Sequence, residues 1–560
     1  MGRSGNRAGN KIFSFNTTVR NPIRNIDFLK SFQSFEGIDN SKDNLEKYLF
    51  ELVKLGIYKF TNISQEIKNK LMTNQELEDE EVKIAFTNNP QKTNFTGRVM
   101  TQLRALKDQG FIKFVGTQRK YKIFITKLGH ELINNKIPST DIYTKSMIGT
   151  HSKNPARTSL QNKSRPFLNT LFVINEVNKK WKNGEEPKGI LMHEFATFVL
   201  SMKDCDYKKI ANEIIEYRKK YGKTANKKFI EDYLFVKEEI LPIKYESLIK
   251  DYADDVFRKF QMTNLLIKHG KFKYMYINYS EYNIKKIESL LDYYKEYKFE
   301  EFEDINSYYE YLHEIYLPWS ENESIRIKVL KNKAKKLGRR ITNFDNLNEV
   351  EFRLDNSHYN NILSSIIDKM PFEVIYAELE ILSGKNNANS KYEDVSEPLR
   401  LEYFLAILMG KKYGKEEIVS NIIYSEEGKP LSFAPSGQVD MIYDDKDYPL
   451  IMEPTMAKNR AQQLNSETTN IVRHMKDLEL KTKKQYRTMM IAPFVHIDVI
   501  SYFKFEASTE GVKLAPITIN LFLKLVSNNK FIADFAKEFD KVVEVLTNED
   551  KNKYSLMVNN

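Results

Sequence analysis

The stretch FAPSGQVDMIYDDKDYPLIMEPTMAKNRAQQLNSETTNIVRH, from Phe433 to His474, carries the strongest structural signal in the chain. Two short apolar runs, residues 439–443 and 450–453, flank an aspartate-rich break, a pattern typical of a β-hairpin. The midpoint between Asp440 and Glu453 falls in the break, so a symmetric hairpin places both carboxylates on one face, with Cβ atoms about 5 Å apart. Facing carboxylates repel, and a hard divalent cation such as Mg²⁺ is the usual partner. The hairpin therefore predicts a metal site at Asp440 and Glu453.

Helical segments on both sides of the hairpin add three candidate site residues. Residues 458–480 have a helical pattern in which Glu467 and His474, two turns apart, share one face and are aimed at the hairpin. Residues 399–409 are apolar almost all round, which predicts a buried helix whose only acid is Glu402. Taken singly, Glu402 also fits an ion-paired core acid and His474 a surface histidine. The five residues together, in this order, are far less frequent by chance than any one of them.

This arrangement resembles the AlwI-type family of type IIS restriction and nicking endonucleases, whose catalytic domain belongs to the PD-(D/E)xK nuclease class. The resemblance implies that Asp440 and Glu453 hold Mg²⁺, that Glu402 is a further acidic site residue, and that Glu467 and His474 complete the site. Thr455 departs from the class, which usually has lysine there, although the family itself carries a small residue at this position. Pro454 is a second departure, because a proline removes a hydrogen-bond donor from the strand.

The resemblance also implies partners. A restriction enzyme of this kind acts beside a cognate DNA methyltransferase. It cuts either by transient pairing with a second copy of the chain or with a small nuclease subunit, or it nicks one strand. The sequence leaves these alternatives open.

Length, charge and cysteine content limit the class of protein. The 560 residues predict three or four domains, and the single cysteine, Cys205, excludes a disulfide framework or a zinc cluster within one chain. The net charge is +11, yet residues 91–180 alone carry seventeen Lys and Arg against four acids. A concentrated basic zone indicates a polyanion partner, most often nucleic acid. Neither a secretory signal nor a membrane span is evident, so we expect a cytoplasmic bacterial protein without membrane contact.

Residues 93–134 have the order of a winged-helix domain. A helix over 96–107 ends at a glycine, two alternating strands over 111–115 and 121–125 follow, and a third helix begins near Thr126. Arginine reads guanine and glutamine reads adenine in the major groove, so the polar helix face and the wing tip predict contacts to double-stranded DNA. A winged helix used for protein contacts is the alternative. The candidate DNA-binding residues are Arg98, Thr101, Gln102, Arg104, Arg119 and Lys120.

The expected fold is multidomain, with a mostly α-helical N-terminal half that contains winged-helix recognition subdomains and a C-terminal α/β nuclease domain with a mixed sheet. The predicted divisions are a flexible basic arm at 1–40, a winged-helix subdomain at 41–150, a basic linker at 151–166, a second helical or winged-helix-like subdomain at 167–300, a helical linker at 301–345 and the nuclease domain at 346–560.

The expected function is a Mg²⁺-dependent DNA endonuclease that binds a short asymmetric duplex site and cuts at a fixed offset outside it. Two rivals remain: a non-catalytic winged-helix regulator, and a structure-specific DNA repair nuclease. Neither a Walker-type loop nor a Gly-x-Ser-x-Gly motif occurs, so ATP hydrolysis and serine chemistry are unsupported.

Overall fold

The structure is a computed structural model. In it, the chain forms two compact units. The first unit comprises Met1–Leu45, Thr96–Leu354 and Ser425–Glu427, and the second comprises Glu46–Phe95, Asp355–Tyr424 and Gly428–Asn560. The second unit thus contains most of the predicted nuclease domain and also residues 46–95, which the sequence grouped with the winged helix. The structure describes residues 11–559 except 59, 61–62, 65–66, 68–76, 90–94, 118–119, 135–137, 158–161, 182–187, 241–242, 270–275, 342–343, 345, 387, 389, 393–394, 434–438, 458–459 and 461–462.

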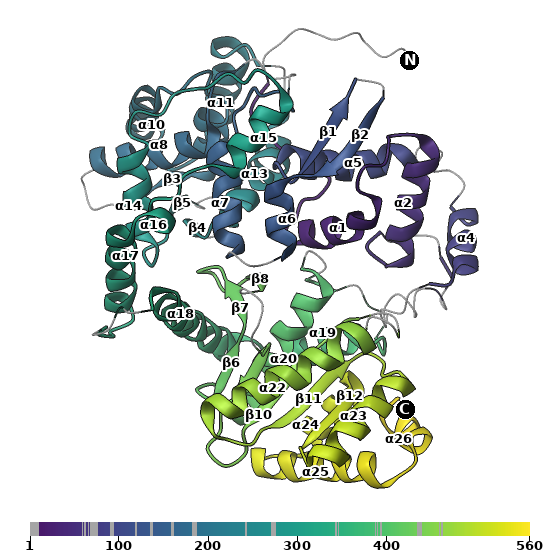
Figure 1. The fold of residues 1–560 in the computed structure, drawn as a ribbon. Coiled ribbons are helices and arrows are strands. Elements are labelled where there is room, and N and C mark those ends of the chain that lie inside the picture. The colour runs from purple at the N-terminus through teal and green to yellow at the C-terminus, as the bar shows by residue number, and fades with distance from the viewer. Residues whose placement is uncertain are drawn as a thin grey trace. The chain divides into compact units, whose positions relative to one another are not determined.

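The first unit contains the predicted order of helix, hairpin and helix (Figure 1). Helix α5 (Phe95–Asp108) leads to β1 (Ile112–Gly116), which pairs antiparallel with β2 (Tyr121–Ile125), and α6 (Lys127–Asn134) follows. Gly110 ends α5 with φ +84°, a conformation that favours glycine. A Cβ at this position would also lie 2.4 Å from Cδ1 of Leu312. The element order is as predicted.

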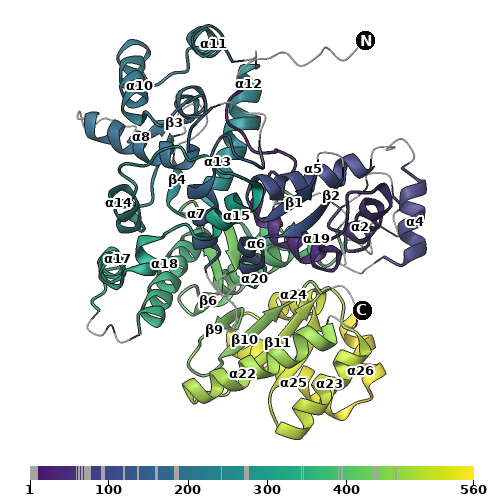
Figure 2. The same ribbon diagram turned by 45° about the horizontal axis from the view of Figure 1, so that its top comes forward.

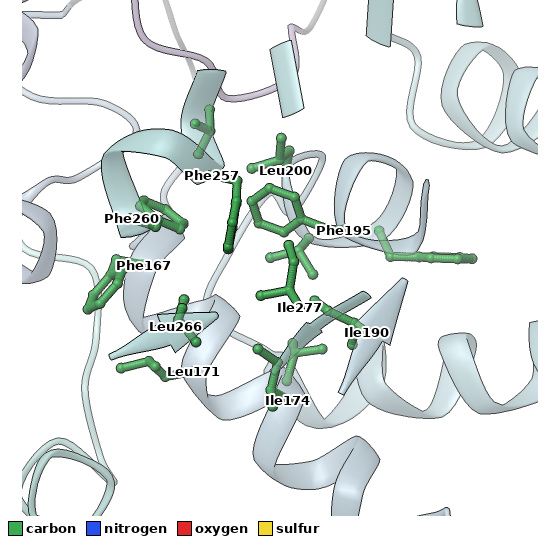
Figure 3. Packing of buried hydrophobic residues seen from close by; sticks show 14 of the residues in the cluster. Phe167, Leu171, Ile174, Ile190, Phe195, Leu200, Phe257, Phe260, Leu266 and Ile277 are labelled. Carbon is green, nitrogen blue, oxygen red and sulfur yellow. The ribbon is translucent and has the colours of Figure 1, made fainter. Parts of the chain in front are cut away.

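A large apolar core occupies the rest of the first unit (Figure 3). Helix α8 (Pro166–Lys180) supplies Phe167, whose ring meets that of Phe260 on α13 (Asp254–Gln261) at 5.0 Å. A three-stranded antiparallel sheet, in the order β3 (Ile190–Leu191), β5 (Tyr276–Tyr279), β4 (Leu266–His269), adds Ile190, Leu266 and Ile277. The second subdomain predicted at 167–300 therefore contains a helix followed by an antiparallel hairpin, α13 and then β4 with β5.

The remaining elements of the first unit are helical. They are α1 (Asn25–Phe32), the start of α2 (Lys42–Lys54), α7 (Ser139–Gly149), α9 (Met192–Glu194), α10 (Tyr207–Tyr221), α11 (Lys227–Asp232), α12 (Tyr245–Ser247), α14 (Ile284–Tyr293), α15 (Ile305–His313), α16 (Pro318–Glu321), α17 (Glu323–Lys336), the start of α18 (Leu347–Lys369), the 3-10 turns η1 (Pro22–Arg24) and η2 (Gln33–Phe35), and the π-helical turns η3 (Phe195–Val199), η4 (Tyr233–Lys237) and η5 (Leu248–Ala253).

Two segments that the sequence placed in solvent are packed in the first unit. From Lys11 onward, the predicted arm enters the core: Phe13 is 1% exposed and its backbone N–H donates to the carbonyl of Leu200 at 2.7 Å. In the predicted linker, His151 and Arg165 are buried, and Nη2 of Arg165 donates to the carbonyl of Ile148 at 3.1 Å and to the hydroxyl of Tyr311 at 2.7 Å. The polar composition of the arm and the linker predicted that both would be exposed. Hydrogen bonds to residues far away in the chain make their burial favourable instead.

The second unit is built around a five-stranded mixed sheet in the order β12-β11-β10-β9-β6. Strands β10 (Leu450–Pro454), β11 (Arg487–Ala492) and β12 (Leu514–Thr518) run parallel, whereas β9 (Met441–Tyr443) is antiparallel to both β10 and β6 (Ile418–Ser420). A separate hairpin joins β7 (Ile422–Tyr424) and β8 (Pro430–Phe433). The predicted mixed sheet of an α/β domain is confirmed.

Helices cover both faces of this sheet. Residues 442 and 451 share one face, on which Ile451 packs with Met475 of α22 (Thr469–Thr482). The ring of Tyr443, on the other face, meets Tyr413 at the end of α20 (Glu397–Tyr413) at 6.5 Å. The other elements of the second unit are α4 (Asp79–Thr87), α19 (Phe372–Leu382), the π-helical turn η7 (Gln463–Thr468), α23 (Ile497–Glu510), α24 (Ile519–Asn528), α25 (Ile532–Asn548) and α26 (Lys551–Asn559).

Candidate active site

The strand register brings Asp440 and Glu453 together. In the β9–β10 pair, Ile442 lies opposite Ile451 and Met441 opposite Met452, so one further step places Asp440 opposite Glu453. The carbonyl of Asp440 accepts a hydrogen bond from the backbone N–H of Asn421 at 2.8 Å, which continues the β6–β9 pairing to this residue. The two carboxyl groups are themselves hydrogen-bonded to each other. The symmetric hairpin expected from the sequence is therefore present.

His474 approaches the same pair from the helix above. It lies on α22, and its Nδ1 is 3.1 Å from Oε1 of Glu453. Glu453 is 5% exposed and shares the sheet face with Ile451, the face that α22 covers. The helix was predicted to aim His474 at the hairpin, and this contact confirms that geometry. The catalytic roles of the three residues stay predictions.

The electrostatics of the pair are those of a site suited to a cation. Burial raises the pKa of Asp440 well above its ordinary value, and the charge of Glu453 and the hydrogen bond between the two carboxyls raise it further. His474 acts in the opposite direction. Burial and the neighbouring carboxyl of Glu453 therefore both favour the protonated form of Asp440 when no cation is bound. The four oxygens are hard donors, so the donor set fits a Mg²⁺-type ion that displaces this proton. Among the described residues, no group of three or more His, Cys, Asp and Glu side chains has metal-site geometry.

The end of β10 accommodates the two departures from the nuclease class. The backbone N–H of Thr455 donates to the carbonyl of Ile491 on β11 at 2.8 Å. Since N–H groups alternate in direction along a strand, the nitrogen of Pro454 faces the other side, where the β9 pairing has already ended. Proline therefore costs no hydrogen bond here. The Thr455 hydroxyl accepts from the backbone of Ala457 at 3.0 Å, so it shapes the turn after the strand.

Of the two other predicted site residues, the structure describes the side chain of Glu402 but not that of Glu467. Glu402 lies on α20 and is 4% exposed, as expected for a buried helix. The pKa of the Tyr424 hydroxyl is raised mainly by burial, and the charge of Glu402 contributes to the shift. The role of Glu402 in the site stays a prediction. Glu467 falls in η7, and its side chain lies outside the described residues.

The predicted DNA-facing residues differ in exposure. Arg98 and Arg104 on α5 and Lys120 at the hairpin turn are exposed, whereas Thr101 is half-buried and its hydroxyl donates to the carbonyl of Gly97. Gln102 is 8% exposed, so a base contact by this side chain would require it to leave the interior. Arg119 lies outside the described residues.

Acidic residues between 300 and 310 neutralise part of the basic zone. Helix α15 lies beside β1 and α6 (Figure 2), and Glu310 on it pairs with Lys127 at 2.6 Å. Just upstream, Glu300 pairs with Arg165 at 3.1 Å and Glu301 with Lys163 at 2.6 Å. The acid-rich composition of residues 296–314 was the signal that could have indicated this. Arg104 on α5 and Lys120 at the hairpin turn take part in none of these three pairs and are exposed.

No helix in the described part of the chain is long and apolar enough to cross a membrane.

Comparison with known proteins identifies the family. A search of curated proteins finds no match. Two solved restriction endonucleases are similar at low scores. The small subunit of the heterodimeric restriction endonuclease R.BspD6I has 18% identity and TM-score 0.27, over 32% of this chain and 92% of its own. FokI has 11% identity and TM-score 0.20, over 96% and 97%. A family model described as AlwI restriction endonuclease matches residues 107–525, well over half of the chain. The chain therefore belongs to the AlwI family of restriction endonucleases, which are DNA-binding, site-specific deoxyribonucleases.

Proposed function

We propose that this chain is a type IIS restriction endonuclease that uses Mg²⁺ to hydrolyse a phosphodiester bond at a fixed offset from a short asymmetric duplex site. The observation that carries the proposal is the hydrogen-bonded pair Asp440 and Glu453, with His474 on Glu453, at the end of a mixed sheet in a member of this family. Ligands of open α/β sheets bind at the carboxyl ends of strands, where Glu453 lies.

In this mechanism, Asp440 and Glu453 would hold the cation. Bound Mg²⁺ would polarise the scissile phosphate, stabilise its developing charge and lower the pKa of a water molecule. His474, through its contact with Glu453, keeps that carboxylate in orientation, as partners of metal ligands commonly do. His474 or Glu467 orients or deprotonates the attacking water. In most enzymes of this nuclease class a lysine shares the task of activating the water, but this chain has Thr455 at that position.

DNA recognition is assigned to the first unit. The exposed cations Arg98, Arg104 and Lys120 on α5 and the β1–β2 hairpin support a winged-helix mode, with α5 toward the major groove. The antiparallel hairpin after α13 is a candidate second recognition element. A cognate methyltransferase would protect the host's own sites.

One Asp440–Glu453 pair serves one phosphodiester at a time. Cutting both strands therefore requires a second copy of the chain or a small nuclease subunit, and the chain acting alone nicks. These two modes leave different end patterns, which makes them separable by experiment.

The deciding experiment incubates the purified chain with supercoiled and mixed-sequence linear DNA, in Mg²⁺ or EDTA, and maps the ends on both strands. Mg²⁺-dependent breaks at one distance from one short motif are expected, and the strand map separates nicking from double-strand cutting. Specific binding without breaks would indicate a regulator. Breaks at junctions or flaps irrespective of sequence would indicate a repair nuclease.

A further inference from the structure

Gln463 makes an unusual set of contacts beside the candidate active site. It opens the π-helical turn η7, and it is 1% exposed. Its Nε2 donates to the carbonyl of Phe494 at 2.8 Å and to that of Ala457 at 3.4 Å. Its Oε1 accepts from the backbone N–H of His496 at 3.3 Å. Both functions of the amide are thus used on backbone groups from two other segments of the chain.

These segments are the continuations of two neighbouring parallel strands. The β10–β11 ladder ends with the hydrogen bond from Thr455 to Ile491. Beyond it, Ala457 follows β10, Phe494 follows β11, and His496 is the N-cap residue of α23. Beyond the last β10–β11 hydrogen bond, the Gln463 amide therefore links the chain after β10 to the chain after β11. It also binds the first residue before α23.

The position of this contact relates it to the proposed chemistry. Glu453 is the next-to-last residue of β10, and residues 455–457 form the turn directly after it. The Thr455 hydroxyl closes this turn on the backbone of Ala457, and Gln463 binds the carbonyl of the same residue. A shift of this turn would displace the carbonyl end of β10, where a cation and a phosphate would bind.

We propose that Gln463 is a positioning residue, which keeps the end of β10 and the Glu453 carboxylate in the orientation that binds the cation. This inference rests on the proposed function, since it assigns Gln463 a part in the same site. Groups that support metal ligands typically change metal affinity by about 10–100-fold when removed. We expect the same range here.

The test uses Gln463→Met, which keeps the length but removes the hydrogen bonds, and Gln463→Glu, which sets a carboxylate oxygen against two carbonyls. Gln109 provides the matched control: it is fully buried in the first unit, accepts from Asn25 at 2.9 Å and donates to the carbonyl of Ala105 at 3.0 Å. The controls are Gln109→Met and Gln109→Glu. For each full-length chain we would measure Mg²⁺ affinity by calorimetry, the Mg²⁺ concentration for half-maximal cleavage, and the melting temperature.

Both Gln463 variants are expected to require about tenfold or more Mg²⁺ in both measurements, with site-DNA binding retained. The Gln109 variants should lose melting temperature without a change in Mg²⁺ requirement. An unchanged Mg²⁺ requirement in the Gln463 variants, or a loss of folding in both of them, would make Gln463 a structural residue only and overturn the inference. A wild-type chain that neither binds Mg²⁺ nor cleaves DNA would instead overturn the proposed function, and the inference with it.

Discussion

Asp440 is the residue on which the proposed chemistry depends most directly. The strand register places its carboxyl opposite that of Glu453, and burial together with the charge of Glu453 raises its pKa. Two facing carboxyls of this kind gain stability when a cation takes the place of the proton that lowers their mutual repulsion.

The substitution Asp440→Asn is nearly isosteric and removes one charged ligand. We expect cleavage to fall by at least about a hundredfold, because lost electrostatic stabilisation of a transition state typically costs this much. Site-specific DNA binding should persist, as measured by gel shift beside a strand-mapping cleavage assay. Loss of binding together with cleavage would contradict the assignment of recognition to the first unit.

His151 is a residue whose burial has a consequence for stability. It is fully buried, and its Nε2 has no hydrogen-bond partner. The rings of Phe299 and Phe302 lie 5.3 and 5.1 Å away. Burial, followed by the charge of Arg165, lowers the pKa of His151 from 6.5 to about 3.

The unfolded chain protonates His151 below pH 6.5, whereas the folded chain does so only near pH 3, so stability decreases as the pH falls through this interval. At pH 5 the loss should be about 2 kcal/mol. Urea unfolding at pH 7.5 and pH 5.0 measures it, and His151→Gln should reduce the pH dependence by that amount. An equal pH dependence in both proteins would show that His151 is accessible to protons in the folded state.

At the scale of elements, α15 determines which cations of the predicted DNA-binding region remain available. Lys127 on α6 is paired with Glu310 of α15, while Arg104 on α5 and Lys120 at the hairpin turn are exposed without an ion pair among the described residues. The boundary between these two groups predicts the edge of the DNA footprint.

Arg104→Ala and Lys120→Ala should each weaken DNA binding and reduce the slope of log K against log salt by about 1, as expected for one lost phosphate contact. Lys127→Ala is the matched control, since its ammonium is already neutralised, and should change the slope little. Binding isotherms at several salt concentrations measure all three. A Lys127→Ala effect as large as the other two would mean that α15 does not limit the interface.

At the scale of the whole molecule, each of the two units has buried apolar residues of its own. Chains with more than one core commonly depart from two-state unfolding, and a ligand stabilises the part that binds it. The proposed cation site lies entirely in the second unit.

Calorimetry of the full-length chain should therefore resolve two transitions, and Mg²⁺ should shift only one of them. At a concentration of 100 Kd, the expected stabilisation is about 2.7 kcal/mol. The Asp440→Asn chain should lose this shift while both transitions remain. A single transition that Mg²⁺ moves as a whole would show that the two units unfold together.

The sequence by itself determined the elements and much of their pairing. The apolar runs at 439–443 and 450–453 and the centred break predicted the β9–β10 hairpin and the facing of Asp440 and Glu453, because side-chain alternation and turn position are local properties. The helix, glycine stop and hairpin at 95–125 followed from the same kind of signal.

Only the tertiary structure decided which polar residues are buried and what they bind. The packing of the segment after Lys11, the pairing of α15 with the basic zone and the contacts of Gln463 all depend on partners far away in the chain. Polar composition favours solvent when each residue is considered locally. A distant hydrogen-bond or charge partner reverses that preference, and sequence periodicity carries no information about such partners.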